Sequence, residues 1–330
     1  MPNMNSRIRP HAIDFVSQFV DRHPVFLLEG VDGNLVVKQE GDNRVNVGNS
    51  AAIMTSVDPG ARSVVLESVE VAALTAISKV CKHGDGCKCD KIKHFLNTGK
   101  ASTWIKMEAK TDLLDLASAA EARFQGDRTN VKLIAKTLRD TGGLEKLGSI
   151  IAADAFNGYN DRFAFDGHGG DLFPPNATDT APGRLKCLLN VGNVFVCMAP
   201  SGGATVVGLD TFDPGSQHKD WRTELNEGVV EWPGRMLADS ALAERMAFAS
   251  MVAEDLETVL GPRNRKNPFG TKRRMPKDAA KRLNAGMFEG AKKIRRSLID
   301  RGRQGYKHPI GLVQRLDALG WLNERDFKLD

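Results

Sequence analysis

IIAADAFNGYNDRF, at residues 150–163, joins an apolar run to a dense group of polar side chains. The first part has the composition of a buried helix end, and the second carries Asn157, Asn160, Asp161 and Arg162. Turn chemistry alone accounts for such residues in an ordinary loop. Their density directly after a buried helix is hard to explain by packing. We therefore expect a functional site at Asp161 and Arg162.

The chain on either side of this segment is predicted to be largely helical. TNVKLIAKTLRD and LEKLGSIIAADAF have helical periodicity and are divided by the breaker at 141–143. DLLDLASAAEARF, before them, and the apolar pattern at 236–260 predict further helices. The part of the chain that follows residue 110 is thus expected to be mainly helical.

Two apolar strands are predicted downstream, after a long glycine-rich loop at 157–183. Asn193 lies at the start of one strand, in NVGNVFV, and Asp210 ends the other, in ATVVGLDTFDP. An amide and a carboxylate from adjacent strand ends offer the hard oxygen ligands that Mg²⁺ prefers. The sequence therefore predicts a magnesium site at Asn193 and Asp210.

The first hundred residues alternate short apolar runs with turn signals. PVFLLEG and LVVKQE flank the turn VDGN and predict a β-hairpin, with Lys38 near the end of its second strand. Apolar residues at helical spacing predict a helix over 64–80 whose polar face carries Glu67 and Glu70. The segment ASTWIKMEAK at 101–110 is β-like in its middle. These patterns predict an α+β fold, strand-rich first and helical afterwards.

The polar residues match the parts that phosphoryl transfer needs: a lysine on the phosphates, ligands for Mg²⁺ and a base near the attacking hydroxyl. Lys38 can supply the ammonium, Glu70 the carboxylate that holds it, and Asp161 the base. Each also has a simpler interpretation, because Lys38 can be a surface lysine at a strand end and Glu70 a solvent-facing helix residue. Their order along the chain favours the catalytic interpretation.

The order Lys, Glu, Asn-Asp-Arg, Asn, Asp resembles the atypical branch of the protein-kinase-like superfamily: the phosphoinositide kinases, the secretory-pathway kinases and, most of all, the actin-fragmin kinase catalytic domain. In that branch N-x-D-R or N-D-R replaces the H-R-D of ordinary protein kinases, and NDR stands here at 160–162. The resemblance extends over roughly residues 25–215. It implies a two-lobed protein-kinase-like fold, with an N-lobe at 1–110 and a C-lobe at 111–330.

The resemblance also implies an activity and residue roles. The implied activity is an ATP-dependent kinase that phosphorylates protein serine or threonine, with Asp161 as the catalytic aspartate and Arg162 positioning its loop. ATP and Mg²⁺ are the implied cofactors. Their expected contacts are Lys38 on the phosphates, Glu70 paired with Lys38, a hinge at Lys106, Met107 and Glu108 whose backbone receives adenine, and Asn193 and Asp210 on magnesium.

Three features depart from the family pattern. About thirty residues separate Asp161 from Asn193, which leaves Asn190 open as the magnesium ligand. Asp210 is followed by Thr-Phe without the usual glycine, which leaves Asp213 open in its place. No G-x-G-x-x-G loop is present to cover the phosphates. Phosphorylation of a lipid or small molecule, and nucleotidyl transfer on the same fold, therefore remain alternatives.

A basic segment at 262–309 holds 16 Lys or Arg against 3 Asp or Glu. The simpler interpretation is the solvated face of an amphipathic helix, and the other is a docking surface for an acidic partner. Nucleic acid is not expected as a partner. A non-catalytic basic interaction module is the second alternative to a kinase.

Composition indicates a soluble protein: of the 330 residues, 41% are hydrophobic and 26% charged. No apolar stretch reaches the ~18 residues of a transmembrane helix, and no secretory signal is visible. Five cysteines favour a reducing compartment, so we expect a cytoplasmic location. Cys81, Cys87 and Cys89, near His83 and His94, lack the C-x2-C spacing of a zinc knuckle. A polar loop is the expected structure there.

Overall fold

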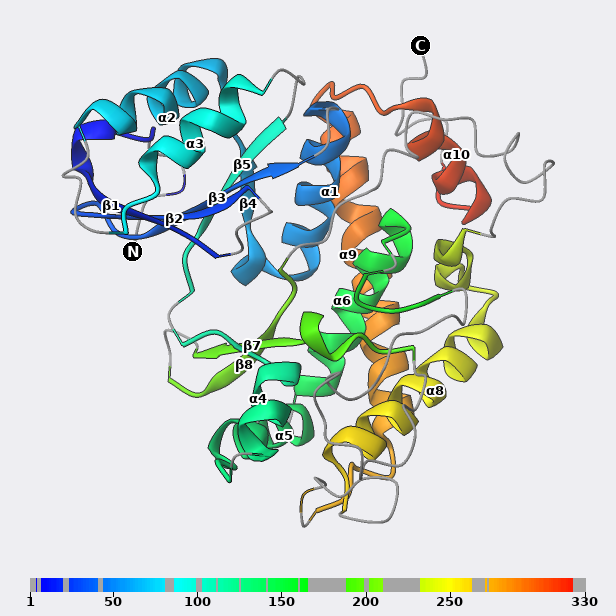
Figure 1. Cartoon of the computed structure of the whole chain (residues 1–330). Helices are drawn as coiled ribbons and strands as arrows, with labels where there is room; N and C mark the ends of the chain where they lie inside the picture. Colours follow the sequence, from blue (N-terminus) through cyan, green and yellow to red (C-terminus); the bar gives the residue numbers. More distant parts are fainter. Residues whose placement is uncertain are drawn as a thin grey trace. The chain divides into compact units, whose positions relative to one another are not determined.

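The computed structural model describes 4, 7–19, 24–40, 44–80, 86–98, 103–110, 112–124, 126–140, 142–159, 161–165, 188–198, 202–209, 232–262, 271 and 273–322. The chain divides into two compact units, which we call unit 1 (residues 1–52 and 61–110) and unit 2 (residues 53–60 and 111–330). Residues 53–60 lie within the range expected for the first lobe but belong to unit 2. Unit 1 is sheet-rich and unit 2 is mainly helical, which confirms the α+β class (Figure 1).

Unit 1 is built on a five-stranded antiparallel sheet of order β1-β2-β3-β5-β4. Its strands are β1 (Ile13–Gln18), β2 (Val25–Gly30), β3 (Leu35–Glu40), β4 (Ser63–Val65) and β5 (Thr103–Glu108). The predicted hairpin is confirmed as β2 and β3, and its turn uses Gly33 at a φ of 99°, which glycine adopts without strain.

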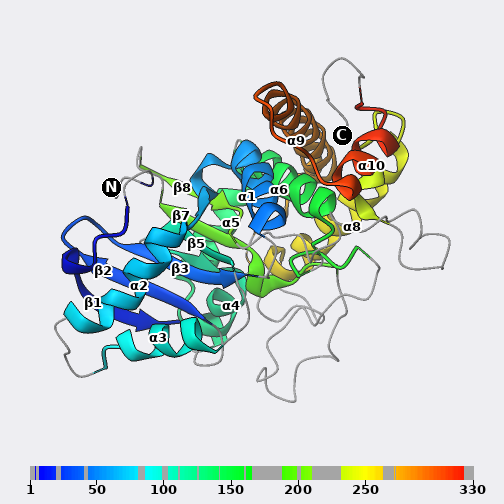
Figure 2. The same cartoon turned by 90° about the horizontal axis from the view of Figure 1, so that it is seen from above.

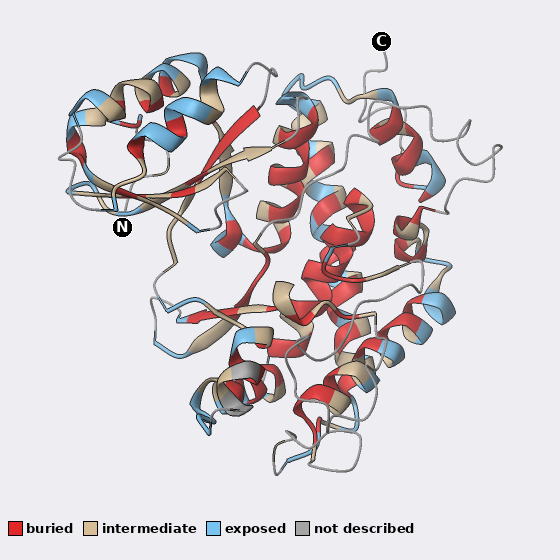
Figure 3. Ribbon diagram, in the orientation of Figure 1, coloured by how far each residue is buried: buried red, intermediate tan, exposed pale blue. Residues whose placement is uncertain are grey.

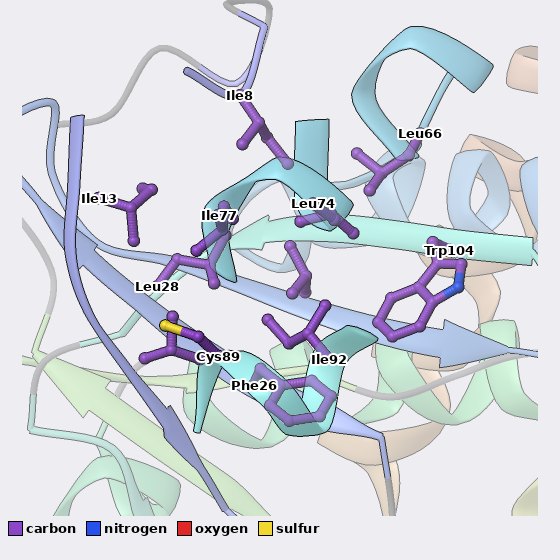
Figure 4. Packing of buried hydrophobic residues seen from close by; sticks show 12 residues of the cluster. Ile8, Ile13, Phe26, Leu28, Leu66, Leu74, Ile77, Cys89, Ile92 and Trp104 are labelled. Carbon is purple, nitrogen blue, oxygen red and sulfur yellow. The ribbon is translucent and has the colours of Figure 1, made fainter. Parts of the chain in front are cut away.

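Two helices cover one face of this sheet, α2 (Ser68–Val80) and α3 (Cys89–Asn97) (Figure 2). Strand and helix side chains form one apolar core there (Figure 4), which includes Phe26, Leu28, Leu74, Ile77, Ile92 and Trp104. The predicted helix at 64–80 is wrong in its first turn, because the β-branched pair Val64 and Val65 joins the sheet as β4 and the helix begins at Ser68.

Helix α1 (Arg44–Val57) follows β3, and its first nine residues belong to unit 1 while the end belongs to unit 2. Unit 2 also contains a three-stranded antiparallel sheet of order β6-β7-β8. Its strands are β6 (Leu114–Asp115), β7 (Phe195–Met198) and β8 (Ala204–Val207). The last two confirm that two strands lie here, but Asn193 does not begin one, because it belongs to a short 3-10 helix and β7 starts at Phe195.

The helices of unit 2 are α4 (Leu116–Phe124), α5 (Thr129–Arg139), α6 (Gly143–Asn157), α8 (Leu242–Leu260), α9 (Ala279–Arg303) and α10 (Ile310–Ala318). Helix α6 is buried along almost its whole length (Figure 3), as its apolar sequence predicts. It packs closely on α9, since a Cβ on Gly148 would lie 2.2 Å from the Leu283 carbonyl oxygen (Figure 1). No helix in the described ranges is long and apolar enough to cross a membrane.

Candidate functional site

The candidate site lies in the loop that follows α6. The helix ends at Asn157, and Gly158 reverses the chain at a φ of 71°. The loop then runs antiparallel to the segment before β7, where Phe163 pairs with Leu189 and the Asn190 N–H donates to the Arg162 carbonyl oxygen over 2.9 Å. This pairing brings residues 161–164 and 188–193 together although a long stretch of sequence separates them.

Arg162 is the centre of the buried part of the site. Its side chain is only 1% exposed, and its Nε donates to the Asp154 carboxylate over 2.8 Å. One terminal nitrogen donates to the Asn193 carbonyl oxygen over 2.6 Å, and the other donates to the Leu209 carbonyl oxygen. A guanidinium has a fixed planar set of donors, so these bonds hold α6, the turn before β7 and the end of β8 in one arrangement.

Asp161 is exposed, and its carboxylate is held by neighbouring side chains. Its Oδ2 accepts hydrogen bonds from Asn193 Nδ2 over 2.8 Å and from the Tyr159 hydroxyl over 3.0 Å. Its backbone oxygen accepts from Asn190 Nδ2 over 2.7 Å and from Asn193 Nδ2 over 3.1 Å. The carboxylate therefore faces solvent in a fixed orientation, which a base that orients an acceptor hydroxyl requires.

Asn190 and Asn193 differ in whether their side-chain amide oxygen already accepts a hydrogen bond. In Asn190 both amide groups are engaged, because Nδ2 donates to the Asp161 backbone oxygen and Oδ1 accepts the Gly192 N–H over 3.1 Å. This Oδ1 caps the short helix η3 (Val191–Asn193). Asn193 donates only through Nδ2, and among the described residues no donor engages its Oδ1. The geometry thus favours Asn193 as the oxygen ligand of a cation. Asp210 and Asp213 lie outside the described residues.

A half-buried carboxylate supports the segment that precedes Asn190. Asp255 on α8 accepts the N–H groups of Leu188 and Leu189 over 2.9 and 3.3 Å. The pKa of Asp255 is raised above its ordinary value, because burial raises it by more than these two backbone hydrogen bonds lower it.

The expected pair of Lys38 and Glu70 is wrong. Glu70 accepts a hydrogen bond from Lys106 Nζ over 2.6 Å, with the two side chains 7% and 3% exposed, whereas Lys38 Nζ lies 2.7 Å from Glu40 Oε1. The reason is strand alternation. Val37 is the β3 residue directly opposite Lys106, so Lys106 points to the face that α2 covers and Lys38 points to the other face.

The expected hinge at Lys106, Met107 and Glu108 is also displaced. These residues belong to β5, and Lys106 and Met107 have paired strands on both sides. Backbone groups in such a strand are committed to the neighbouring strands, so they are not available to adenine. Among the described strands Glu108 pairs with β3 alone, at Leu35, so a backbone contact of this kind is expected at Glu108 or the residues after it.

The cysteine candidates belong to unit 1. Cys87 and Cys89 have sulfur atoms 3.0 Å apart, Cys89 is buried in the unit 1 core, and Cys81 and His83 lie outside the described residues. Among the residues that the structure describes, no three His, Cys, Asp or Glu side chains form a group that could hold a metal ion. Several basic residues of α9 are exposed, whereas 263–270 and 272 lie outside the described part.

No family model matches the chain, and no curated protein matches it. The site is therefore characterised by its own geometry.

Two contributors were missed in the sequence, Asp154 and Tyr159, whereas Asn190 was left open as the magnesium ligand and instead holds the Asp161 backbone. Asp154 carried a signal, because a carboxylate inside the apolar run IIAADAF must be buried, and a buried carboxylate needs a partner. Tyr159 carried none beyond its proximity to the candidates. Together the described residues form an exposed carboxylate, an amide oxygen beside it and a buried arginine that fixes both.

Proposed function

We propose that the chain is an ATP-dependent kinase of the atypical protein-kinase-like type, which transfers the γ-phosphate to a protein serine or threonine. The observation that carries this proposal is the contact of 2.8 Å between the exposed Asp161 carboxylate and the amide of Asn193. It joins the two loops whose residues the resemblance assigns to catalysis and to metal binding. The resemblance supplies the reaction and the acceptor class, and the geometry supports both assignments.

In the proposed reaction Asp161 accepts a hydrogen bond from the acceptor hydroxyl and orients its oxygen for in-line attack on the γ-phosphorus. The bond between the γ-phosphorus and the β,γ-bridging oxygen breaks, ADP leaves, and the hydroxyl proton passes to Asp161. Tyr159 and Asn193 hold the carboxylate in place through hydrogen bonds, and Arg162 fixes the loop through its bonds to Asp154 and to the Asn193 carbonyl oxygen. Lys38 is proposed to contact the phosphates of ATP. Its pairing with Glu40 rather than Glu70 makes Glu40 the carboxylate that orients it.

The donor set fits Mg²⁺. An amide oxygen of Asn193 and a carboxylate oxygen of Asp210 are the hard ligands that this ion prefers, and Mg²⁺ ordinarily keeps several waters beside one or two protein ligands. In the proposal Asn193 and Asp210 hold the ion. Mg²⁺ bound there neutralises phosphate charge.

Thermal unfolding with ATP tests the proposal against a basic interaction module. A binding protein gains stability as RT ln(1 + [L]/Kd), about 2.7 kcal/mol at a hundredfold excess over Kd. We expect ATP to raise the unfolding temperature with Mg²⁺ present and to do so less without it. Asn193→Ala should remove the Mg²⁺-dependent part, whereas Asn97→Ala, an exposed change on α3, should leave it unchanged. No effect of Mg²⁺ and ATP on the wild-type protein would contradict the proposal.

A further inference from the structure

Asp58, at the end of α1, carries a buried carboxylate that belongs to none of the sequence motifs. Its side chain is 3% exposed, and it accepts three hydrogen bonds. Oδ1 accepts from Lys146 Nζ over 2.5 Å and from the Gly60 N–H over 3.0 Å, and Oδ2 accepts from the Gly208 N–H over 2.7 Å. Asp58 thereby connects the segment after α1, the first turns of α6 and the residue directly after β8.

The backbone at Gly208 and Leu209 is held from both sides. Asp58 holds the Gly208 N–H, and Arg162 holds the Leu209 carbonyl oxygen. The space around Gly208 is also closed, because a Cβ there would lie 2.7 Å from Met54 Sδ and 3.0 Å from Ile150 Cγ1. Two charged side chains, each at most 3% exposed, therefore fix two successive backbone residues at the strand end. Charge-assisted hydrogen bonds of this kind are among the stronger ones in proteins.

The same network continues to the exposed carboxylate. Arg162, which holds Leu209, also donates to the Asn193 carbonyl oxygen over 2.6 Å, and Asn193 donates to Asp161 over 2.8 Å. A displacement of the Gly208 and Leu209 backbone must therefore move the guanidinium or break its bond. Either event changes the support of Asn193.

We propose that Asp58 is a positioning residue for the site, which fixes the strand end through Gly208 and, through Arg162, fixes the amide of Asn193. The proposal deepens the proposed function and rests on it for the role of Asn193.

The competing possibility is that Asp58 serves only as the counterion of Lys146. Three variants separate the two. Asp58→Leu removes all three hydrogen bonds of the carboxylate, and Lys146→Met removes only the ion pair. Asp58→Asn keeps an oxygen for the Gly208 N–H, while Lys146, whose side chain is 26% exposed, can turn to solvent. Glu145→Gln is the matched control, because it alters an ion pair of the same helix, with Arg282, outside the network.

Two measurements distinguish the effects of these variants. Amide hydrogen exchange at Gly208 reports the bond directly and needs no ligand. The Mg²⁺ concentration that gives half of the maximal ATP binding, measured by calorimetry, reports Asn193. We expect Asp58→Leu to accelerate exchange at Gly208 and to raise the half-saturating Mg²⁺ concentration, each about tenfold or more. Asp58→Asn, Lys146→Met and Glu145→Gln should stay within about threefold of wild type.

The outcomes divide clearly. Rescue by Asn but not by Leu supports positioning, since a lost ion pair alone would affect Asp58→Asn and Lys146→Met equally. Wild-type exchange at Gly208 in Asp58→Leu overturns the proposal, and so does a normal Mg²⁺ requirement in that variant. If Asp58→Leu does not fold, accelerated Gly208 exchange in Asp58→Asn equal to that in Lys146→Met overturns it as well. Absence of Mg²⁺-dependent ATP binding in the wild type refutes the kinase and, with it, the role of Asp58 toward Asn193.

Discussion

Arg162→Met removes a side chain that joins three segments of the site, and its cost in stability can be worked out from the structure. The guanidinium is 1% exposed and its partner Asp154 is 0% exposed, so the variant breaks a buried ion pair from one side. Breaking a buried pair from one side costs about 3–5 kcal/mol. At about 2–4 °C per kcal/mol for a unit of this size class, we expect the unfolding temperature to fall by about 6–20 °C.

Urea unfolding followed by circular dichroism measures this loss. A double variant, Arg162→Met with Asp154→Leu, should recover most of the stability because no buried charge is then left unpaired. Arg9→Ala is the control, since Arg9 and Asp32 form an exposed pair, and such pairs contribute about 1 kcal/mol or less. A loss below about 1 kcal/mol in Arg162→Met would refute the reasoning.

Three further predictions follow from packing, pairing and burial. Gly148→Ala should destabilise the chain by about 1–3 kcal/mol, because its methyl group meets the α9 backbone. Gly48→Ala in α1, where the nearest neighbour of the new Cβ lies at 3.7 Å, should stabilise it by about 0.5–1 kcal/mol, and urea unfolding compares the two variants. Lys106→Met should lower the free energy of unfolding by about 3–5 kcal/mol, because it breaks the buried pair with Glu70. Lys38→Met should lower it less and yet abolish ATP binding in calorimetry, whereas the reverse pattern would make Lys106 the phosphate ligand. Burial lowers the pKa of His308 below its ordinary 6.5, so the unfolded chain takes up a proton at a higher pH than the folded chain, and the free energy of unfolding falls as the pH drops below about 6.5 toward the folded-state pKa. His308→Gln should flatten that part of the pH profile of the unfolding free energy, and an unchanged profile would contradict this.

The sequence was sufficient for the elements that depend on local patterns. The hairpin of β2 and β3 followed from a turn between two apolar runs, and α6 from an apolar run bounded by glycines. The Asp161 loop was found because packing alone rarely places so many polar residues directly after a buried helix. These features are encoded within about twenty consecutive residues.

Features that depend on register could not be predicted in the same way. Lys38 and Lys106 both lie on predicted strands, and only the pairing of β3 with β5 decides which one faces α2 and meets Glu70. Val64 and Val65 fitted a helical period, yet the open edge of β5 draws them into the sheet. Asp58 showed no pattern at all, because its partners Lys146 and Gly208 are 88 and 150 residues away in sequence.

Transfer of the labelled γ-phosphate of ATP, with Mg²⁺ and a cell extract that supplies acceptors, tests the central claim most directly. The proposal predicts label in a protein band with the wild-type chain and none with Asp161→Ala, which keeps the fold because Asp161 is exposed. Label that enters a lipid instead would correct the acceptor class. Equal labelling by Asp161→Ala would contradict the assigned role of that carboxylate, and ATP binding without any transfer of the γ-phosphate would contradict the kinase.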